Sequence, residues 1–176
     1  MSFVENTRKP VGLGGKLMVA AMNLGHQALA RWGLGFLNVG PEAEILDCGC
    51  GGGANLHALL KRCPKGTAVG LDYSPVSVAA SRKKNRAAIA AGRCRVEQGD
   101  VSALPFEDEK FDLATAFETV YFWPDLGGSF REVYRVLKSG GTFLICNESN
   151  GDTDRDEKWT KIIGGMTIYK DIELKA

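Results

Sequence analysis

The feature that most constrains this chain is a short apolar stretch that ends on an acid and runs into glycines. Residues 44–48 have the composition of a buried strand, four of the next five residues are glycines, and a helical pattern begins at Ala54. Glycine tolerates positive φ and lets the backbone approach a ligand closely, and the first N–H groups of a helix are unpaired. The stretch therefore predicts a strand, a turn and a helix that together bind a ligand.

Strand-like and helix-like stretches alternate along the rest of the chain. This alternation is typical of a parallel sheet with helices on both faces and right-handed crossovers. We therefore expect an α/β fold with a doubly wound sheet of five parallel strands. The expected strands are 44–48, 67–71, 93–98, 111–117 and 142–147, and the expected helices are 16–32, 54–62, 75–91, 126–137 and 154–163, with a last helix opening at 171.

Residues 1–15, before the first expected helix, are expected to form a mobile arm or a lid segment. Apolar residues at spacings of three and four predict one buried helix face, and Gly25 is a residue that bends or breaks helices. We expect an N-terminal helical segment at 1–40, a ligand-binding core at 41–150 and a C-terminal helical segment at 151–176. The predicted buried face consists of Leu17, Ala21, Leu24, Ala28 and Trp32.

Composition excludes several classes of protein. The formal net charge of +1 gives no electrostatic reason to expect a nucleic acid or an anionic membrane as partner. No apolar run approaches the roughly 20 residues of a membrane span, and the first residues lack the layout of a signal peptide. Five cysteines, an odd number, indicate free thiols in a reducing cytoplasm. Cys48 and Cys50 have no second ligand pair at zinc spacing, so we predict no metal site.

Two classes of ligand use a glycine turn of this kind, a dinucleotide such as NAD and S-adenosylmethionine. Gly49, Gly51 and Ala54 fit the dinucleotide spacing, and Asp72 lies about where the ribose-binding acid is expected. The glycines alone therefore leave both ligands open.

Asp47 favours S-adenosylmethionine. A carboxylate two residues before the first glycine would repel a pyrophosphate. It would attract an α-ammonium group, or anchor turn amides and water around that group. Asp72 offers acceptors on two oxygens for the ribose hydroxyls, and Asp100 offers one for the adenine amine, with the Val101 backbone at the ring edge. These three acids end three successive strands, so they are expected to line one crevice.

Five segments then resemble one family, in that family's order. They are ILDCGCGGG at 45–53, GLDYS at 70–74, GDVSALPF at 99–106, FDLA at 111–114 and EVYRVLKSGG at 132–141. Together they resemble the small-molecule branch of the class I S-adenosylmethionine-dependent methyltransferases. The resemblance implies a Rossmann-like fold, methyl transfer to a small molecule, and S-adenosylhomocysteine as the product.

The resemblance also implies roles for single residues. The turn would hold the methionine end, the second strand end would meet ribose and adenine, the third would meet adenine, and the fourth would border the methionine and the substrate. The expected cofactor-binding residues are Asp47, Gly49, Cys50, Gly51, Asp72, Tyr73, Ser74, Gly99, Asp100, Val101, Phe117 and Glu118.

The catalytic candidates are His26, Glu118 and Tyr121. Tyr121 and Trp123 are expected at the rim of the cleft, whereas the position of Phe122 is equally compatible with the cleft and the core. A base is needed only if the acceptor atom carries a proton. His57, on the helix after the turn, is expected to be structural.

The C-terminus departs from the family. Its members continue from the fifth strand to an antiparallel strand pair, and here the chain ends before such a pair. An unpaired, apolar fifth strand is a liability, so we expect a fragment or a partner, for example a second copy of the chain, along that edge. Two other hypotheses remain: an NAD-type oxidoreductase, and a module that binds the cofactor without turnover.

Overall fold

The protein is an α/β structure with one parallel sheet. The computed structural model describes residues 4–175, except for the side chains of residues 4, 5, 154 and 155. Five parallel strands lie in the order β3-β2-β1-β4-β5, which confirms the predicted fold class. The strands are β1 (Glu44–Cys48), β2 (Thr67–Asp72), β3 (Cys94–Gln98), β4 (Phe111–Phe117) and β5 (Leu137–Cys146).

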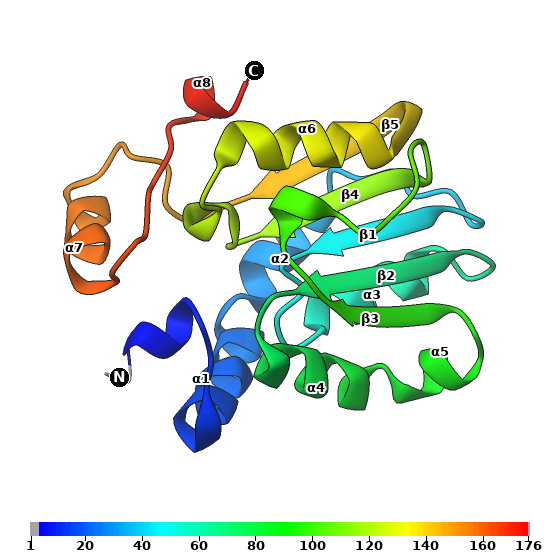
Figure 1. Ribbon diagram of the computed structural model, residues 1–176, viewed down its shortest axis with the longest axis horizontal. Helices are drawn as coiled ribbons and strands as arrows, with labels where there is room; N and C mark the ends of the chain where they lie inside the picture. The colour runs from blue at the N-terminus through cyan, green and yellow to red at the C-terminus, as the bar shows by residue number, and fades with distance from the viewer. Residues whose placement is uncertain (1–3, 176) are drawn as a thin grey trace.

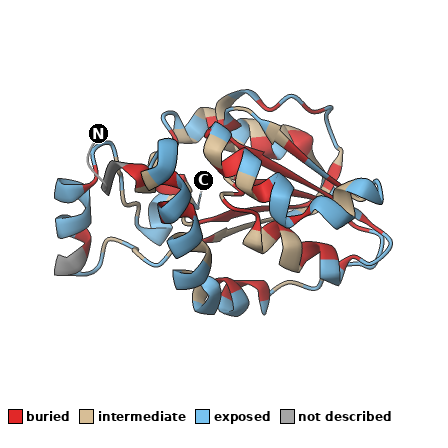
Figure 2. Ribbon diagram, turned by 90° about the horizontal axis from the view of Figure 1, so that it is seen from below, coloured by how far each residue is buried: buried red, intermediate tan, exposed pale blue. Residues whose placement is uncertain are grey.

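Helices cover both faces of this sheet (Figure 1). Two apolar layers form as a result, and Figure 2 shows the strands buried between the helices. None of the described helices is long and apolar enough to cross a membrane. The α-helices are α1 (Gly12–Gly25), α2 (Gln27–Leu34), α3 (Ala54–Arg62), α4 (Pro75–Lys84), α5 (Arg86–Ala90), α6 (Leu126–Val136), α7 (Asp154–Ile162) and α8 (Asp171–Leu174), and the 3-10 helices are η1 (Val4–Thr7), η2 (Val101–Ala103) and η3 (Val120–Phe122).

The direction in which successive strands extend the sheet reverses at β1. β2 and β3 extend the sheet on one side of β1, and β4 and β5 extend it on the other. Open α/β sheets bind ligands at the carboxyl ends of the strands where the order switches. In Figure 1, α1 and η1 lie beyond these carboxyl ends, so the N-terminal segment faces the expected crevice.

Two of the predicted helices are interrupted. The break expected at Gly25 is present, because α1 ends there and α2 begins at Gln27. The helix predicted over 75–91 is divided at Asn85 into α4 and α5. Asn85 is buried, and its side-chain amide donates to the carbonyl oxygens of Gly53 and Ser81, both at 3.1 Å. The interruption thus fixes the end of the glycine turn against α4.

The start of the fifth strand was predicted wrongly. The glycines at 140 and 141 suggested a helix stop, but α6 already ends at Val136 and β5 begins at Leu137. Leu137 pairs with Phe111 of β4, and an irregularity in register takes up the extra residues before Thr142 pairs with Leu113. The glycines therefore lie within an irregular strand. As expected, β5 forms one edge of the described sheet.

The predicted buried face of the N-terminal helices is exposed. Leu17, Leu24 and Trp32 are 67%, 71% and 62% exposed, whereas Met18 and Val19 are buried. Apolar residues surround most of α1, so spacing alone could not identify the inner face. In α2, Gly33 faces β4 and β5, where a Cβ would lie 2.6 Å from the Cys146 Sγ and 3.1 Å from the Phe117 ring. A small residue there lets the helix approach the sheet.

Candidate functional site

The glycine turn after β1 is tied to the end of β2. The N–H groups of Gly49 and Cys50 both donate to the Leu71 carbonyl oxygen, at 2.8 and 2.9 Å. Gly49 has a φ of +73°, and a Cβ on it would lie 2.1 Å from the Thr119 Oγ1. The turn therefore requires glycine at position 49 for both its conformation and its close approach to the segment after β4.

Asp72 holds the same turn from the other side. Its Oδ2 accepts from the Gly51 N–H and its Oδ1 from the Ser74 N–H, both at 2.9 Å. Burial raises the pKa of this carboxyl, and the two backbone donors oppose the shift. The Ser77 side chain also forms a hydrogen bond with this carboxyl. A carboxylate offers about four acceptor sites, so Asp72 still has acceptor capacity for a ligand.

Two neighbouring cavities open at the carboxyl ends of the strands. Their volumes are about 320 and 220 Å³, and they share six lining residues, so they form two parts of one crevice. The shared residues come from the N-terminal segment, the glycine turn, the end of β2 and the segment after β4. They are Arg8, Gly49, Asp72, Tyr73, Thr119 and Phe122.

Asp47 lies behind the turn, outside the lining of both cavities. It is 1% exposed, and its Oδ1 accepts from the Thr115 hydroxyl at 2.8 Å. Burial raises its pKa to about 7, and the neighbouring Asp72 adds to the shift while the Thr115 hydrogen bond opposes it. Direct contact with an α-ammonium group, as expected from the sequence, does not fit this geometry. The carboxyl instead lies in the core beneath the turn.

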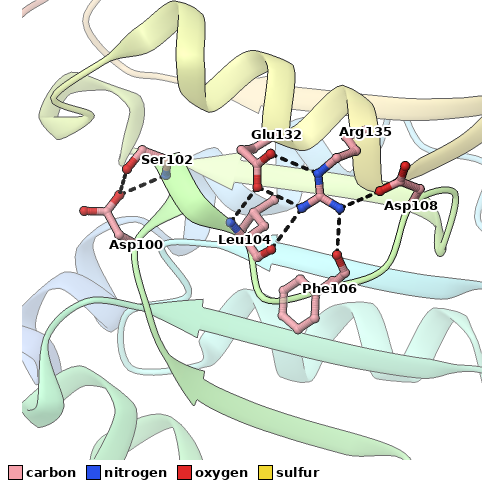
Figure 3. Close-up of polar contacts among 7 residues, drawn as sticks. All are labelled: Asp100, Ser102, Leu104, Phe106, Asp108, Glu132 and Arg135. Carbon is pink, nitrogen blue, oxygen red and sulfur yellow. Dashed lines mark hydrogen bonds and ion pairs between the residues drawn. The ribbon is translucent and has the colours of Figure 1, made fainter.

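The third acid is at the second cavity. Gly99, Asp100 and Val101 all line it, as the sequence predicted. Asp100 Oδ1 accepts from the backbone N–H and the hydroxyl of Ser102, at 2.9 and 2.8 Å, which caps η2 (Figure 3). The loop that carries these residues is thus shaped partly by Asp100 itself.

Arg135 on α6 holds the segment that follows this loop, from Leu104 to Phe106, by hydrogen bonds. Arg135 donates to the carbonyl oxygens of Leu104 and Phe106, at 3.0 and 2.7 Å (Figure 3). Glu132 and Asp108 pair with its guanidinium and raise its pKa, and Glu132 also accepts from the Leu104 N–H. This network links two of the segments on which the family resemblance rests, 99–106 and 132–141.

The residues at the end of β2 differ in role. Tyr73 lines both cavities, and its hydroxyl donates to the Arg8 carbonyl oxygen. Ser74 is completely buried and lines neither cavity. Its hydroxyl caps α4 by accepting from the Ser77 N–H and donates to the Pro10 carbonyl oxygen at 2.9 Å. Ser74 therefore fixes the N-terminal segment in place instead of facing a ligand.

The first cavity is also lined by His26, Phe117 and Glu118, together with Cys50 and Gly51 of the turn. His26 lies at the junction of α1 and α2, and burial lowers its pKa. Glu118 follows β4 with a φ of +56°, which is unusual for a residue other than glycine. Burial raises its pKa to about 7, with a further contribution from the charge of Glu148.

The prediction for the aromatic residues after β4 was wrong for Tyr121. Tyr121 is 3% exposed and lines neither cavity, whereas Phe122 lines both. The Tyr121 hydroxyl contacts Glu118 Oε1 at 3.2 Å and accepts from the Ser149 N–H at 2.8 Å. The short helix η3 turns these side chains in opposite directions, which alternation along a strand would not predict. Trp123 lines the second cavity, as expected at the rim.

Sequence reasoning also missed several lining residues. Arg8, Asn23, Thr119 and Lys84 carry no motif, because each reaches the cavity from a different part of the chain. Asn23 lies so close to the turn that a Cβ on Gly52 would be 2.1 Å from its Nδ2. His57, expected to be structural, also lines the first cavity.

Comparison with known proteins agrees with this geometry. A family model described as a methyltransferase domain matches residues 46–145. A demethylmenaquinone methyltransferase of Roseiflexus castenholzii is 35% identical over 147 residues, which cover 83% of this chain and 60% of that protein. The chain thus spans less than two thirds of the length of this curated relative.

Two solved structures are also similar. A putative methyltransferase in complex with the Haloferax volcanii Trm112 methyltransferase activator has a TM-score of 0.80 and 28% identity, and the match covers 88% of this chain and 67% of that one. A putative S-adenosyl-L-methionine-dependent methyltransferase from Methanococcus maripaludis has a TM-score of 0.64 and 28% identity, over 83% and 69% of the two chains. Because the family model covers more than half of this chain, the chain belongs to the methyltransferase-domain family, and its cofactor is S-adenosylmethionine.

Proposed function

We propose that the two cavities together hold S-adenosylmethionine and that the chain directs transfer of its methyl group to a small, largely apolar molecule. The observation that carries this proposal is Asp72, which lines both cavities and holds the glycine turn through the Gly51 N–H. An elongated ligand with ribose at its centre would place its hydroxyls at this carboxylate.

The two ends of the ligand follow from this central contact. The second cavity offers Asp100 and Val101 to the adenine, through a carboxylate acceptor and the backbone at the ring edge. The first cavity offers Gly49, Cys50 and Gly51 to the methionine end. Asp47 supports the same cofactor from below at and above about pH 7, where its carboxyl is ionised and disfavours a pyrophosphate against the turn.

The chain's own contribution to methyl transfer would be orientation. The bound cofactor supplies a sulfonium that is attacked in line by the acceptor atom. Phe117 and Phe122 border the first cavity and would exclude water from the path of transfer. His26 is neutral near pH 7 because burial lowers its pKa, so it can accept a proton from an acceptor that carries one. Tyr121 would act indirectly, because its hydroxyl contacts the Glu118 carboxylate and helps to hold it in position.

The class of acceptor is proposed from both the lining and the relative. Met22, Ala30, Leu34 and the two phenylalanines give the first cavity an apolar part. The curated relative from Roseiflexus castenholzii is named for a quinone substrate. A small apolar acceptor is consistent with both observations.

A transfer assay tests this proposal. The protein would be incubated with S-adenosylmethionine labelled on its methyl group and with a panel of quinone precursors and sterols. We expect label in an organic-soluble product and an equal amount of S-adenosylhomocysteine, with at least tenfold less of both for Asp72→Ala. Release of S-adenosylhomocysteine without a labelled acceptor would contradict small-molecule transfer. Binding of the cofactor without any release would favour the module without turnover.

A further inference from the structure

Three side chains from distant parts of the sequence converge beside the first cavity. His26 comes from the α1–α2 junction, Glu118 follows β4 and Glu148 follows β5. One possible ligand atom from each of them lies within 4.8 Å of the other two. Two residues of the cluster, His26 and Glu118, also line the first cavity. The cluster therefore presents one nitrogen and two carboxylate oxygens at the carboxyl end of the sheet.

The polar groups of this cluster are poorly satisfied by the protein. Among residues 4–175, the His26 imidazole and the Glu148 carboxylate form neither a hydrogen bond nor an ion pair. His26 is half-buried. The ligands of a tetrahedral ion at 2.0–2.2 Å lie roughly 3.3–3.6 Å apart, so the three groups, all within 4.8 Å of one another, are near enough to close around one cation after small side-chain movements.

The position of Glu118 is held by the surrounding backbone. Its Oε1 accepts from the Glu148 N–H and contacts the Tyr121 hydroxyl, and its own N–H donates to the Cys146 carbonyl oxygen at 3.0 Å. These bonds join the ends of β4 and β5. They hold one carboxylate oxygen, and the other can face the cluster. Oriented ligands of this kind are typical of metal sites.

The charges in the cluster favour a cation. Glu118 and Glu148 each place a carboxylate oxygen within 4.8 Å of the other, so their like charges repel. Burial lowers the pKa of His26, so its imidazole is neutral near pH 7 and has a free lone pair. A neutral imidazole cannot balance the two carboxylates, but it can bind a metal together with them. While a metal is bound through that lone pair, His26 does not serve as the base named above.

We propose that His26, Glu118 and Glu148 bind one divalent first-row transition-metal ion, such as Mn²⁺ or Zn²⁺. A set of one imidazole and two carboxylates suits these ions better than Ca²⁺, which prefers oxygen ligands alone. Three protein ligands leave an open coordination position. This proposal differs from our prediction of no metal site. The sequence could not indicate the site, because its three residues lie far apart in the chain and form no ligand motif.

Titration with Mn²⁺ followed by electron paramagnetic resonance tests the site. Mn²⁺ is the probe because thiols bind it weakly and the chain has five cysteines. The chelator-treated chain should remove one equivalent of the free Mn²⁺ signal at pH 7.5. Zn²⁺ should displace the bound ion, since it binds such ligands more tightly. Affinity should fall as the pH is lowered from 8 to 6, because protons compete for Glu118.

Two variants and one matched control make the test specific. Glu148→Gln, at an exposed position, and His26→Ala should each weaken Mn²⁺ binding at least tenfold, with thermal melts confirming that both variants fold. His57→Ala removes the other histidine of the same cavity and should bind like the parent. No binding by the parent chain, or equal binding by all four proteins, would overturn the proposal. The outcome does not depend on methyl transfer, so this proposal and the proposed function fail separately.

Discussion

The two walls of the first cavity are built in different ways. The turn wall consists of residues 49–53 and Asp72, and backbone hydrogen bonds between β1, the turn and β2 hold it together. The far wall consists of His26, Phe117, Glu118 and Phe122, and it is assembled from the N-terminal helices and the segment after β4. The turn wall is thus encoded within about thirty consecutive residues, whereas the far wall requires the whole fold.

The difference separates two questions about function. Asp47, buried beneath the turn wall, is the residue that favours S-adenosylmethionine over a dinucleotide. In the proposed function the far wall would face the methionine end and the acceptor, and it contains two residues of the cluster of His26, Glu118 and Glu148. A change in the turn wall should therefore affect folding and cofactor binding, and a change in the far wall should mainly affect what the cofactor reacts with.

The largest effect is expected for Gly49→Ala in the turn wall. A Cβ at this position would lie 2.1 Å from the Thr119 Oγ1, and the φ of +73° is unfavourable for alanine. We expect a loss of roughly 3 kcal/mol in the free energy of unfolding, measured with urea. Gly92→Ala is the matched control, since its φ is +72° but nothing lies within 4 Å, and it should lose only about 1 kcal/mol. Equal losses of unfolding free energy in the two variants would show that the contact between residue 49 and Thr119 is unimportant for stability.

Asp72→Ala should have the next largest effect, on cofactor affinity. Loss of the carboxylate frees the Gly51 and Ser74 amides and removes the proposed ribose acceptor. We expect S-adenosylhomocysteine to bind at least tenfold more weakly, about 1.4 kcal/mol, by calorimetry. Asp100→Ala should cost less, because the second oxygen of this exposed carboxylate is solvated. A larger loss for Asp100→Ala would reverse the assigned order of contacts.

Asp47→Asn should change how stability depends on pH. The pKa of Asp47 is raised in the folded chain to about 7, above the ordinary value of 3.8, so the native state binds the extra proton between these values. Stability should therefore fall as the pH rises from about 4 to about 7, by at most about 1.4 kcal/mol per pH unit. The asparagine lacks this contribution but can still accept from Thr115. Urea unfolding at pH 5, 6, 7 and 8 should give a shallower slope for the variant, and identical slopes would contradict the buried, protonating Asp47.

The smallest effect is expected for Tyr121→Phe behind the far wall. The ring stays buried, but the hydroxyl that accepts from the Ser149 N–H is lost. We expect a loss of about 1 kcal/mol in the free energy of unfolding. Cofactor affinity should be unchanged, because Tyr121 lines neither cavity. A tenfold loss of affinity would place Tyr121 in the cofactor site.

Local patterns explain what the sequence predicted well. The bounds of β1 and β4 match the prediction, because each is an apolar run with clear breaks at both ends. The turn glycines, the cap by Ser74 and the two acids Asp72 and Asp100 at the crevice were also predictable, since parallel strands end at the same edge. These features need only neighbours in the sequence or in the sheet.

Long-range packing explains what the sequence did not predict. Which face of α1 is buried depends on how the helix lies against α4 and the turn, not on its own spacing. Tyr121 is buried instead of lying at the rim, and Phe122, whose position the sequence left open, lines both cavities, because a 3-10 turn follows β4. Asp47 is the residue before the last one of β1. It is still part of the strand, and its carboxyl is buried in the core instead of lining the crevice.

The central claim is that the crevice binds S-adenosylmethionine and not a dinucleotide, and calorimetry with the intact chain tests it most directly. S-adenosylhomocysteine and NAD would be titrated separately into the protein and into Asp72→Ala. The account predicts one bound S-adenosylhomocysteine per chain, weakened at least tenfold in the variant, and no heat of binding for NAD. Binding of NAD with no binding of S-adenosylhomocysteine would contradict it.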